Sequence, residues 1–458
     1  MEMEALNLIL DNTESLRSVR DQIVTSEKTL TPSIRLQGIY AEPMLVLNDE
    51  VAVKGLASRE HKIACLKIHG LPTIAEKTTL LRQYILCIFQ TRVLLVYCSK
   101  VRQAWLAGGT KTKREAFRRV PSADNTREVR RIRALAIRAL YATGLDYGVV
   151  KMGIQPGNTA VVLDVKPAPR LNKGMEAAFA EAINGYVTQL PRLVTEPDQV
   201  VLGADPEFLM CRTGGGLVMA SRYFPRFGRV GCDAIWHGQN RADKPLVELR
   251  PQPTNDPRQL VIRLYKGMLV AAKRVNMPQI QWLAGALPHP RFPLGGHIHF
   301  SGISVNFKLL RALDHYLALP MVLVEDKRGV YRRPKYGFLG DFRPQFHGGF
   351  EYRTLPSWLI SPVLTKGVLA AAQLIVARYP FLPATDFRDL SVQRSYYNGE
   401  KENLRARAAR LWEELRLLPE YKVHQRYLDT LSEFLFSGKT WDESKDFRTL
   451  WKLPPYHR

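Results

Sequence analysis

Several features typical of exported, membrane-bound or zinc-binding proteins are missing from this chain of 458 residues. Its five cysteines are scattered, and no CxxC pair is present to hold zinc or to form a redox couple. We therefore expect reduced, mostly buried thiols. No run of about 18 apolar residues occurs, and the start, MEMEALNLILDNTE, is acidic where a signal peptide would be basic. We expect no membrane segment and a cytoplasmic location.

Acidic residues are scarce relative to basic ones. The chain has 66 Lys and Arg against 43 Asp and Glu, which gives a formal net charge of +23. Such a charge attracts anions of any kind, including nucleotides, acidic peptides and nucleic acids. The excess is densest in KTKREAFRRV and between Arg127 and Arg138, where few aromatic residues interleave and no RNP, zinc-finger or helix-turn-helix signature occurs. We therefore expect an anionic ligand and do not favour a nucleic acid.

The composition, 46% hydrophobic and 24% charged, is that of a globular protein of two or three domains. ILCIFQTRVLLVYCS predicts a β-hairpin, and GVVKMGI and TAVVLDV predict strands around the turn QPGN. VRRIRALAIRALYATG predicts a helix that ends at Gly144, and NLRARAARLWEELRLL predicts an amphipathic helix. The expected parts are an N-terminal segment (1–50), a smaller α/β domain (51–192), the domain that holds the chemistry (197–385) and a helical extension (386–458).

Four short stretches share one pattern: charged or imidazole side chains two residues apart on an otherwise apolar strand. Residues at this spacing point to the same face of a strand. If the four strands are neighbours in one antiparallel sheet, they present carboxylates, imidazoles and guanidinium groups on a single concave surface. The stretches are GADPEFLM with Asp205 and Glu207, PLVELRPQP with Glu248 and Arg250, GGHIHFSG with His297 and His299, and GGFEYRTLPSW with Glu351 and Arg353.

Such a surface makes a poor core, because several buried carboxylates cost free energy unless metal ions or arginines compensate them. Carboxylate and phosphate oxygens suit Mg²⁺, and Mg²⁺ in turn points to ATP. Arginines nearby would neutralise the charge of a transferred phosphoryl group. The glycine pairs before His297 and Phe350 are expected to let the backbone approach a ligand closely. Ser301 and Ser357 lack a base partner in the sequence, and we expect them to bond the backbone.

The order of these blocks resembles the glutamine synthetase and glutamate–cysteine ligase superfamily, and in particular the phage-type carboxylate–amine ligases (amidoligases) of the second type. GADPEF, GCDAI, VELRPQP, GGHIHFSG, GDFRP and FEYRTLPSW carry the resemblance, over about residues 197 to 380. It implies an α+β fold with flanking helices, in which an antiparallel β-sheet forms a glutamine-synthetase-like funnel. ATP would enter at one mouth of the funnel, and the acid substrate at the other end.

The resemblance also implies roles for single residues. The metal ligands would be Asp205, Glu207, Glu248, His297 and Glu351. The cofactor would be bound by His299, Arg250 and Arg353, with His299 near the ATP phosphates. Glu207, Arg343 and Arg353 would act in catalysis, and Asp233 is a weaker candidate. The implied reaction uses ATP and Mg²⁺, or Mn²⁺, to turn a carboxylate into an acyl phosphate, which an amine then attacks to give an amide. The substrates would be a carboxylate-bearing small molecule or peptide and an amine.

Residues 51 to 173 are similar to the ATP-grasp fold in degenerate form. SREHKIACLKIHGLPT resembles the helix and strand that precede its nucleotide clamp, and ALYATGLDYGVVKMGIQPGNTAVVLDVKPAPRL resembles its closing metal-site block. Two departures oppose a second ATP site. The segment between GLPT and RQYILCIF is short, and the metal-binding E-x-N is replaced by Asp164-Val165-Lys166, with Lys151 where an acid belongs. We expect a scaffolding or substrate-presenting role.

Two other functions fit parts of the sequence. A metal-dependent oxygenase or hydrolase would need only His297, His299 and one carboxylate, and it leaves the other acids unexplained. A basic nucleic-acid-binding protein would show steeply salt-dependent binding of DNA or RNA that survives substitution of Glu207.

Overall fold

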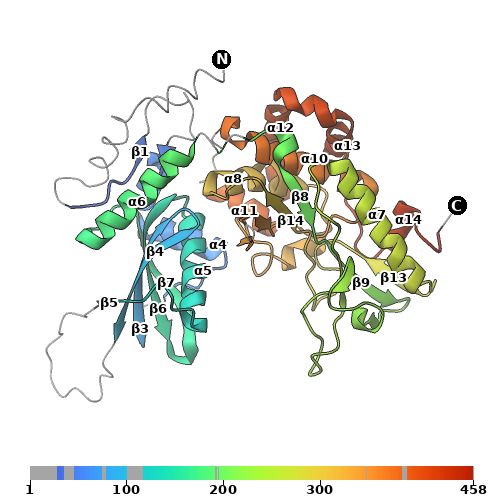
Figure 1. Cartoon of the computed structure of the whole chain (residues 1–458), viewed down its shortest axis with the longest axis horizontal. Helices are drawn as coiled ribbons and strands as arrows, with labels where there is room; N and C mark the ends of the chain where they lie inside the picture. The colour runs from blue at the N-terminus through green and yellow to red at the C-terminus, as the bar shows by residue number, and fades with distance from the viewer. Residues whose placement is uncertain are drawn as a thin grey trace. The chain divides into compact units, whose positions relative to one another are not determined.

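The computed structural model describes residues 28–35, 46–74, 79–100, 117–190, 193, 195–346, 348–383 and 389–456. Most of the expected N-terminal segment and of KTKREAFRRV lies outside these residues. The chain forms two compact units, of which the first ends at Leu193 and the second holds nearly all of the residues that follow (Figure 1). The domain boundaries expected from the sequence stay predictions. Among the described residues, no helix is both long and apolar enough to span a membrane.

The first unit is built on a five-stranded sheet with the strand order β5-β4-β3-β6-β7. All four pairings are antiparallel, so this unit is an α+β fold, and the α/β label expected for it is corrected. The predicted hairpin and the strands around QPGN are confirmed. The elements are β1 (Ile34–Arg35), β2 (Val46–Leu47), α3 (Glu50–Gly55), α4 (Arg59–Ile68), β3 (Arg82–Phe89), β4 (Arg92–Lys100), β5 (Phe117–Arg119), α5 (Arg127–Ala142), β6 (Tyr147–Gln155), β7 (Thr159–Lys166) and α6 (Lys173–Gln189).

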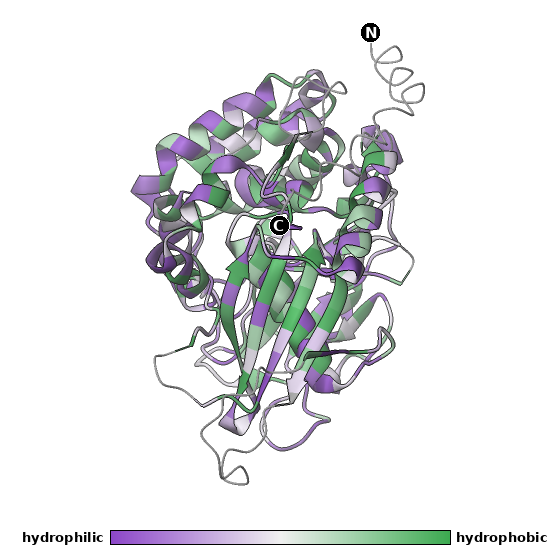
Figure 2. Cartoon of the chain, turned by 90° about the vertical axis from the view of Figure 1, so that its left-hand side faces the viewer, coloured by the Kyte–Doolittle hydropathy of each residue, from purple (hydrophilic) through white to green (hydrophobic). Residues whose placement is uncertain are grey.

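Helices α5 and α6 cover opposite faces of this sheet. Tyr147 at the start of β6 packs against Phe179 of α6, whereas a side chain at the next residue, Gly148, would meet Leu140 of α5. Consecutive strand residues point to opposite faces, which places the two helices on the two sides. Figure 2 shows that the strands of this sheet are largely hydrophobic, with single hydrophilic residues among them. Helix α5 ends where predicted, because Gly144 adopts a positive φ of 76° just beyond it.

The second unit contains two antiparallel sheets. One has the order β10-β9-β12-β11, with β13 also paired to β9, and the other has the order β15-β16-β14-β8. The strands are β8 (Val201–Ala204), β9 (Glu207–Arg212), β10 (Leu217–Val218), β11 (Val230–Cys232), β12 (Leu246–Leu249), β13 (Ile280–Leu283), β14 (Ile298–Ser301), β15 (Phe342–Pro344) and β16 (Phe350–Tyr352). The helices are α7 (Pro257–Arg274), α8 (Phe307–Leu313), α9 (Leu319–Met321), α10 (Pro362–Arg378), α11 (Leu390–Asn398), α12 (Lys401–Arg416), α13 (Gln425–Phe436) and α14 (Arg448–Trp451).

The expectation that the four charged stretches lie in one sheet is wrong. GADPEFLM does not form one strand, because β8 ends at Ala204 and β9 begins at Glu207. Pro206 lies between them and has no N–H group to continue the ladder. The chain therefore passes from the sheet that holds His299 and Glu351 to the sheet that holds Glu248, and Asp205 lies at the crossing.

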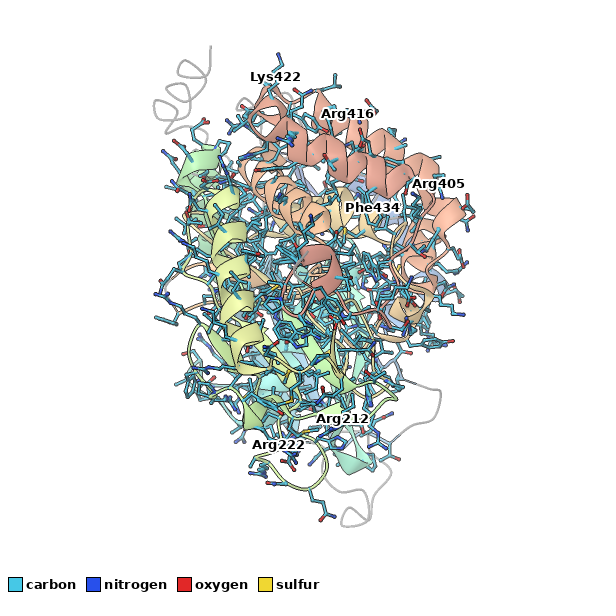
Figure 3. The ribbon with its side chains drawn as sticks, turned by 90° about the vertical axis from the view of Figure 1, so that its right-hand side faces the viewer. Arg212, Arg222, Arg405, Arg416, Lys422 and Phe434 are labelled. Carbon is cyan, nitrogen blue, oxygen red and sulfur yellow. The ribbon has the colours of Figure 1, made fainter. Side chains whose placement is uncertain are left out.

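Helix α10 forms the centre of the helical part of this unit. Nearly all of its side chains from Leu364 onward are buried, and it packs against α7, α8 and α13. The predicted amphipathic helix is confirmed as α12, which buries Leu404, Leu411 and Trp412 among others. Figure 3 shows the charged side chains of the C-terminal helices at the surface. All five cysteines are free and four of them are buried, as expected.

Candidate active site

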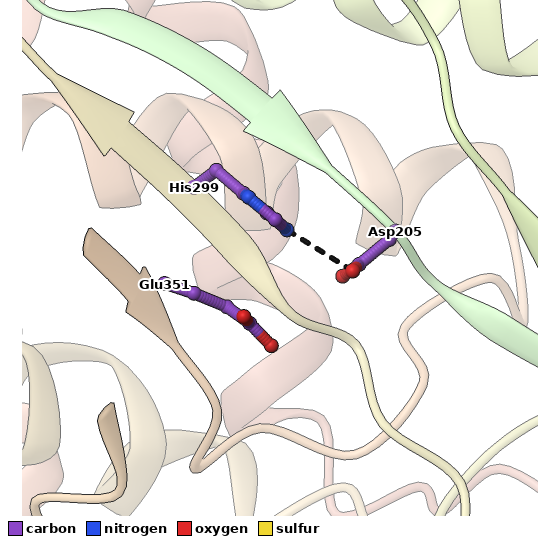
Figure 4. A group of neighbouring side chains, drawn as sticks. All are labelled: Asp205, His299 and Glu351. Atoms are coloured by element: carbon purple, nitrogen blue, oxygen red, sulfur yellow. Dashed lines mark ion pairs between the residues drawn. The ribbon is translucent and has the colours of Figure 1, made fainter. Parts of the chain in front are cut away.

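Cross-strand pairing places the candidate residues of one sheet in a row. His299 on β14 lies opposite Gly203 on β8 and opposite Glu351 on β16, and Glu351 in turn lies opposite Arg343 on β15. A side chain at Gly203 would come within 3.2 Å of the Cβ atom of His299, so the glycine leaves room for the imidazole. Side chains in such a row share one face of the sheet. Figure 4 shows His299 and Glu351 beside Asp205, which comes from the end of β8.

Both histidines of GGHIHFSG face this group, as the sequence spacing predicts. Nε2 of His299 lies 3.1 Å from Oδ2 of Asp205. Nδ1 of His297 lies 3.2 Å from Oδ1 of Asp205 and 3.3 Å from Oε1 of Glu351. Burial alone would raise the pKa of Asp205, but the two imidazoles lower that pKa well below its usual value. The pKa of His299 is raised, because its contact with Asp205 outweighs the effect of burial.

The donor atoms of this group fit a divalent metal ion. One ligand atom each from Asp205, His299 and Glu351 lies within 4.8 Å of the other two. Asp205 Oδ1, His299 Nε2 and Glu351 Oε1 are buried and have no aligned hydrogen bond among the described residues, although charged neighbours are within ion-pair distance. Buried acceptors in that state need a ligand to satisfy them. Two carboxylates and an imidazole suit Mg²⁺ or Mn²⁺ when further oxygen ligands come from a substrate.

Arginines gather around Glu351. Its side chain is fully buried, and Oε2 accepts a hydrogen bond of 2.6 Å from Nε of Arg343 and one of 3.0 Å from Gln345. Nε of Arg353 lies 3.1 Å from Oε1. The side chain of Arg343 is 56% exposed and that of Arg353 is 25% exposed, so both can also reach a bound anion.

A second group of acids lies where the two sheets meet. Glu207 and Glu248 are direct partners in the antiparallel pair of β9 and β12. Like charges in that arrangement destabilise a sheet. Burial, and then the negative charge of Asp233, raises the pKa of Glu207 well above its usual value. Burial and the charge of Asp205 raise the pKa of Glu248 to about 8, although Arg250 forms an ion pair with it.

The backbone holds Glu207 in place. Its N–H group donates to Gly295 O at 2.9 Å, and its Oε2 atom accepts from the N–H group of Gly295 at 2.7 Å. Ser357 donates its hydroxyl to the carbonyl of Glu207, which confirms that this serine bonds the backbone. No cation forms an ion pair with Glu207 among the described residues. The described part of the chain therefore supplies no counter-charge to this buried carboxyl group.

Tyr336 also belongs to the site, although no motif in the sequence indicates it. Its hydroxyl lies 2.6 Å from Nε2 of His297. The guanidinium groups of Arg332 and Arg353 lie 4.7 and 5.6 Å from the centre of its ring. Burial and the nearby charge of Glu207 raise the pKa of Tyr336 well above its usual value. Tyr336 is positioned by the loop before β15, where strand spacing gives no signal.

The glycine pair before His297 has a different purpose from the one expected. A side chain at Gly295 would come within 2.1 Å of Nε2 of His297, and one at Gly296 would come within 2.3 Å of the carbonyl oxygen of Pro356. The indole of Trp358 donates to the carbonyl of Gly296 at 2.9 Å. The protein itself fills the space beside both glycines, so the expectation that they admit a ligand to the backbone is wrong for this pair.

The structure thus brings the predicted site residues into two adjoining groups. Asp205, His297, His299, Glu351, Arg343 and Arg353 form one, and Glu207, Glu248 and Arg250 form the other. Asp233 acts on the second group through its charge. The distinct roles expected for the two histidines stay predictions, since both contact Asp205.

A comparison with protein families identifies the second unit. A family model described as phage phiEco32-like COOH.NH2 ligase-type 2 matches residues 202–453, which is more than half of the chain. The chain belongs to this family. The match contains all four charged stretches and confirms the resemblance stated from their order. It also extends through the C-terminal helices. The match to the ligase family thus covers nearly the whole second unit.

Three solved structures are similar to parts of the chain. Macrocyclase MdnB from Microcystis aeruginosa MRC is 13% identical over 31% of this chain and 59% of its own length, with a TM-score of 0.22. A bifunctional glutathione synthetase from Pasteurella multocida is 12% identical over 53% of this chain and 48% of its own length, with a TM-score of 0.32. Macrocyclase MdnC, from the same Microcystis strain and bound with precursor peptide MdnA, is 11% identical over 38% of this chain and 68% of its own length, with a TM-score of 0.25.

At these TM-scores the three similarities carry no argument about this chain. The ATP-grasp-like character of the first unit therefore stays a prediction. No curated protein matches the sequence.

Proposed function

We propose that the protein is an ATP- and Mg²⁺-dependent carboxylate–amine ligase that forms an amide or peptide bond through an acyl phosphate. One observation carries the proposal. Asp205, His299 and Glu351 converge within 4.8 Å, and Glu207 and Glu248 lie opposite one another beside them. Such a group of acids is unfavourable in a structural core, but it suits metal ions and a polyphosphate. Membership of the COOH–NH2 ligase family selects the reaction among those that such a site could support.

The residues divide between metal, phosphate and acid substrate. Asp205, His297, His299 and Glu351 would hold one Mg²⁺, and Glu207 and Glu248 would hold a second at the adjoining group. Bound Mg²⁺, or Mn²⁺ in its place, would neutralise phosphate charge. Arg343 and Arg353, which contact Glu351, would turn toward the transferred phosphoryl group. Arg250 would bind ATP while it keeps its ion pair with Glu248.

The proposed reaction has two steps. A carboxylate oxygen of the substrate bonds to the γ-phosphorus of ATP, and the bond to the β-phosphate oxygen breaks to release ADP. The amine nitrogen then bonds to the carbonyl carbon of the acyl phosphate, which loses phosphate, and the nitrogen loses a proton. The acidic group around Glu207 would attract a cationic amine, and this carboxylate would accept one proton from the ammonium so that its nitrogen can attack. The proton that the nitrogen loses after the attack would go to the released phosphate.

We further propose that the two sheets line a funnel of the glutamine synthetase type. ATP would bind at the Glu351 end and the acid substrate at the Glu207 end. The substrates would be a carboxylate-bearing small molecule or peptide and an amine. The first unit would present the substrate or act as a scaffold. The oxygenase or hydrolase alternative gives no role to Glu207 and Glu248, and the family membership does not support it.

Screening amino acids and short peptides for amine-dependent ADP formation tests the proposal. A carboxylate labelled with ¹⁸O is expected to transfer one labelled oxygen to the released phosphate, since the acyl phosphate shares that atom. Glu207→Gln and Glu351→Gln should abolish turnover. Glu402→Gln, on the exposed face of α12, removes one acidic charge far from the acids in sequence and serves as the matched control. Turnover that survives in both site variants would refute the assignment.

A further inference from the structure

A cavity lies in the second unit, on the side of β12 away from the acids. It has a volume of about 490 Å³ and is bordered by helix α7 and by strands β11 and β12. On β12, Leu249 lines this cavity while the preceding residue, Glu248, belongs to the acidic group. Consecutive strand residues point to opposite faces, so the cavity and the candidate active site lie on opposite sides of one strand.

The cavity combines an aliphatic lining with a basic rim. Its apolar lining comes from Val230, Leu249, Leu264 and Val270, and its basic lining comes from Arg229, Arg263, Lys266 and Arg274. The residues contributed by α7 recur at intervals of three and four and so share one side of the helix. No Asp or Glu is among the described residues that line the cavity. A volume of this size is in the range that binds small ligands or single peptide side chains.

None of the four cations forms an ion pair with an acid among the described residues. Arg229, Lys266 and Arg274 are exposed, and none of them forms an ion pair within the described part of the chain. Arg263 donates to the carbonyl oxygens of Gln252 and Pro253 at 2.9 and 2.7 Å, which fixes it at the edge of the cavity. Some arginines elsewhere in this unit differ, because they are paired with acids, as Arg328 is with Asp326 and Asp442. The unpaired charges are therefore available to an anion from outside.

The aliphatic lining also indicates which type of anion the cavity would bind. None of the described residues that line the cavity is aromatic, so a nucleobase would find no ring to stack on. Val270 is 49% exposed, and Gly267 leaves the helix surface open over Leu249 and Val230, whose nearest atoms lie 3.7 and 3.9 Å from where a Cβ would be. An aliphatic side chain would replace the water over these groups, while flanking carboxylates would pair with the guanidinium groups.

We propose that this cavity is a docking site for an acidic peptide segment in which an aliphatic side chain is flanked by carboxylates. Binding there would be independent of ATP and of the acids on the other side of β12. The backbone nevertheless connects the two sites: the N–H group of Arg250 donates to the carbonyl of Arg229 at 2.8 Å, and Nη1 of Arg250 donates to the carbonyl of Arg226 at 3.2 Å. A docked peptide would therefore lie next to the segment of Arg226 and Arg229, which bonds Arg250, the ion-pair partner of Glu248.

Fluorescence anisotropy with a short labelled peptide of leucine flanked by glutamates tests the proposal on the full-length protein. Two matched peptides are measured beside it, one with serine in place of leucine and one with glutamine in place of glutamate. We expect each replacement to weaken binding about tenfold or more, because the site needs both the aliphatic group and the charges. Equal binding of all three peptides, or no binding of the first, would overturn the proposal.

Matched variants on α7 locate the site. Lys266→Glu combined with Arg274→Glu reverses two cations of the rim and should weaken binding of the glutamate–leucine peptide about tenfold or more. Arg258→Glu combined with Lys273→Glu makes the same change in net charge at exposed positions of the same helix outside the cavity, and it should leave most of the affinity intact. Equal losses in both double variants would show that overall charge attracts the peptide, and the assignment would fail.

A substitution in the apolar lining separates a pocket from a charged surface. Val270→Ser should weaken the leucine peptide and leave the serine peptide unchanged, since only the former contacts the aliphatic lining. Single-stranded DNA serves as a competitor. If it binds more tightly than the peptide and Val270→Ser has no effect on either, the rim is a nucleic-acid surface and the peptide proposal is wrong. Peptide binding that is equal with and without Mg²⁺ and ATP would distinguish this site from the proposed active site.

Discussion

Replacing Glu207 by glutamine is predicted to stabilise the folded protein while it abolishes ligase activity. Glu207 is 4% exposed, and its side chain accepts one hydrogen bond, from Gly295, that the glutamine oxygen can also accept. The carboxylates of Asp233, Asp205 and Glu248 act on it with like charge. Glutamine has nearly the same shape, so the substitution removes the repulsion and keeps the packing.

The size of the effect follows from the surroundings of the carboxyl group. Burial and the neighbouring acids raise the pKa of Glu207, so the folded state binds this proton more tightly than the unfolded chain does. The free energy of unfolding of the wild type therefore decreases as the pH rises from the usual pKa of glutamate toward the raised pKa of Glu207. In Glu207→Gln this decrease is absent, because the glutamine does not titrate. The advantage of Glu207→Gln should be about 1 kcal/mol, or about 1–2 °C for a chain of this length, in mildly alkaline buffer, and smaller in mildly acidic buffer.

Differential scanning calorimetry of metal-free protein measures this effect directly. Glu351→Gln is the contrasting variant, because it removes a buried acid that two arginines contact, and it should cost about 3–5 kcal/mol. A gain of stability in Glu207→Gln together with a loss in Glu351→Gln would show that Glu207 serves function alone, whereas Glu351 also supports the fold. A loss of stability in Glu207→Gln similar to that in Glu351→Gln would refute the reasoning, since Glu207 would then be a structural residue.

Three further substitutions give distinct outcomes. Tyr336→Phe removes the hydroxyl that bonds His297, so turnover should fall about tenfold or more while the melting temperature changes little; unchanged turnover would contradict this. Gly295→Ala places a Cβ within 2.1 Å of the His297 imidazole and should therefore weaken Mn²⁺ binding, which electron paramagnetic resonance measures. A variant that binds Mn²⁺ as tightly as the wild type would contradict this prediction. Glu443→Ala leaves three N–H groups without their acceptor and should lower the free energy of unfolding by about 2–4 kcal/mol in denaturant unfolding. The exposed control Glu433→Ala should lower it little. Equal losses in the two variants would contradict this prediction.

Local patterns predicted much of this protein correctly. The hairpin of β3 and β4, the end of α5 at Gly144 and the amphipathic helix α12 all depend on residues close in sequence, where hydrophobic period and turn chemistry decide the outcome. Spacing also placed the two histidines of GGHIHFSG on one face, because the side-chain period of an extended segment is two residues. His297 and His299 face the same carboxylate for that reason.

Pairing between distant strands could not be predicted in the same way. The crossing from one sheet to the other at Asp205 depends on Pro206 and on which strands meet in space, and the assumption of one sheet failed there. Tyr336 reaches His297 from a loop, so no strand or helix period marks it. Gly295 accommodates the ring of a residue two positions later, a contact that follows from the bend of the backbone and not from composition.

Binding of ATP in the presence and absence of Mg²⁺, measured by isothermal titration calorimetry, tests the central claim most directly. The claim is that the acids around Asp205 and Glu351 hold the metal and the nucleotide phosphates. We predict that wild-type protein and Glu402→Gln bind ATP only with Mg²⁺, and that Glu351→Gln weakens this binding about tenfold or more. Absence of ATP binding by the wild type, or equal affinity in Glu351→Gln, would contradict the account.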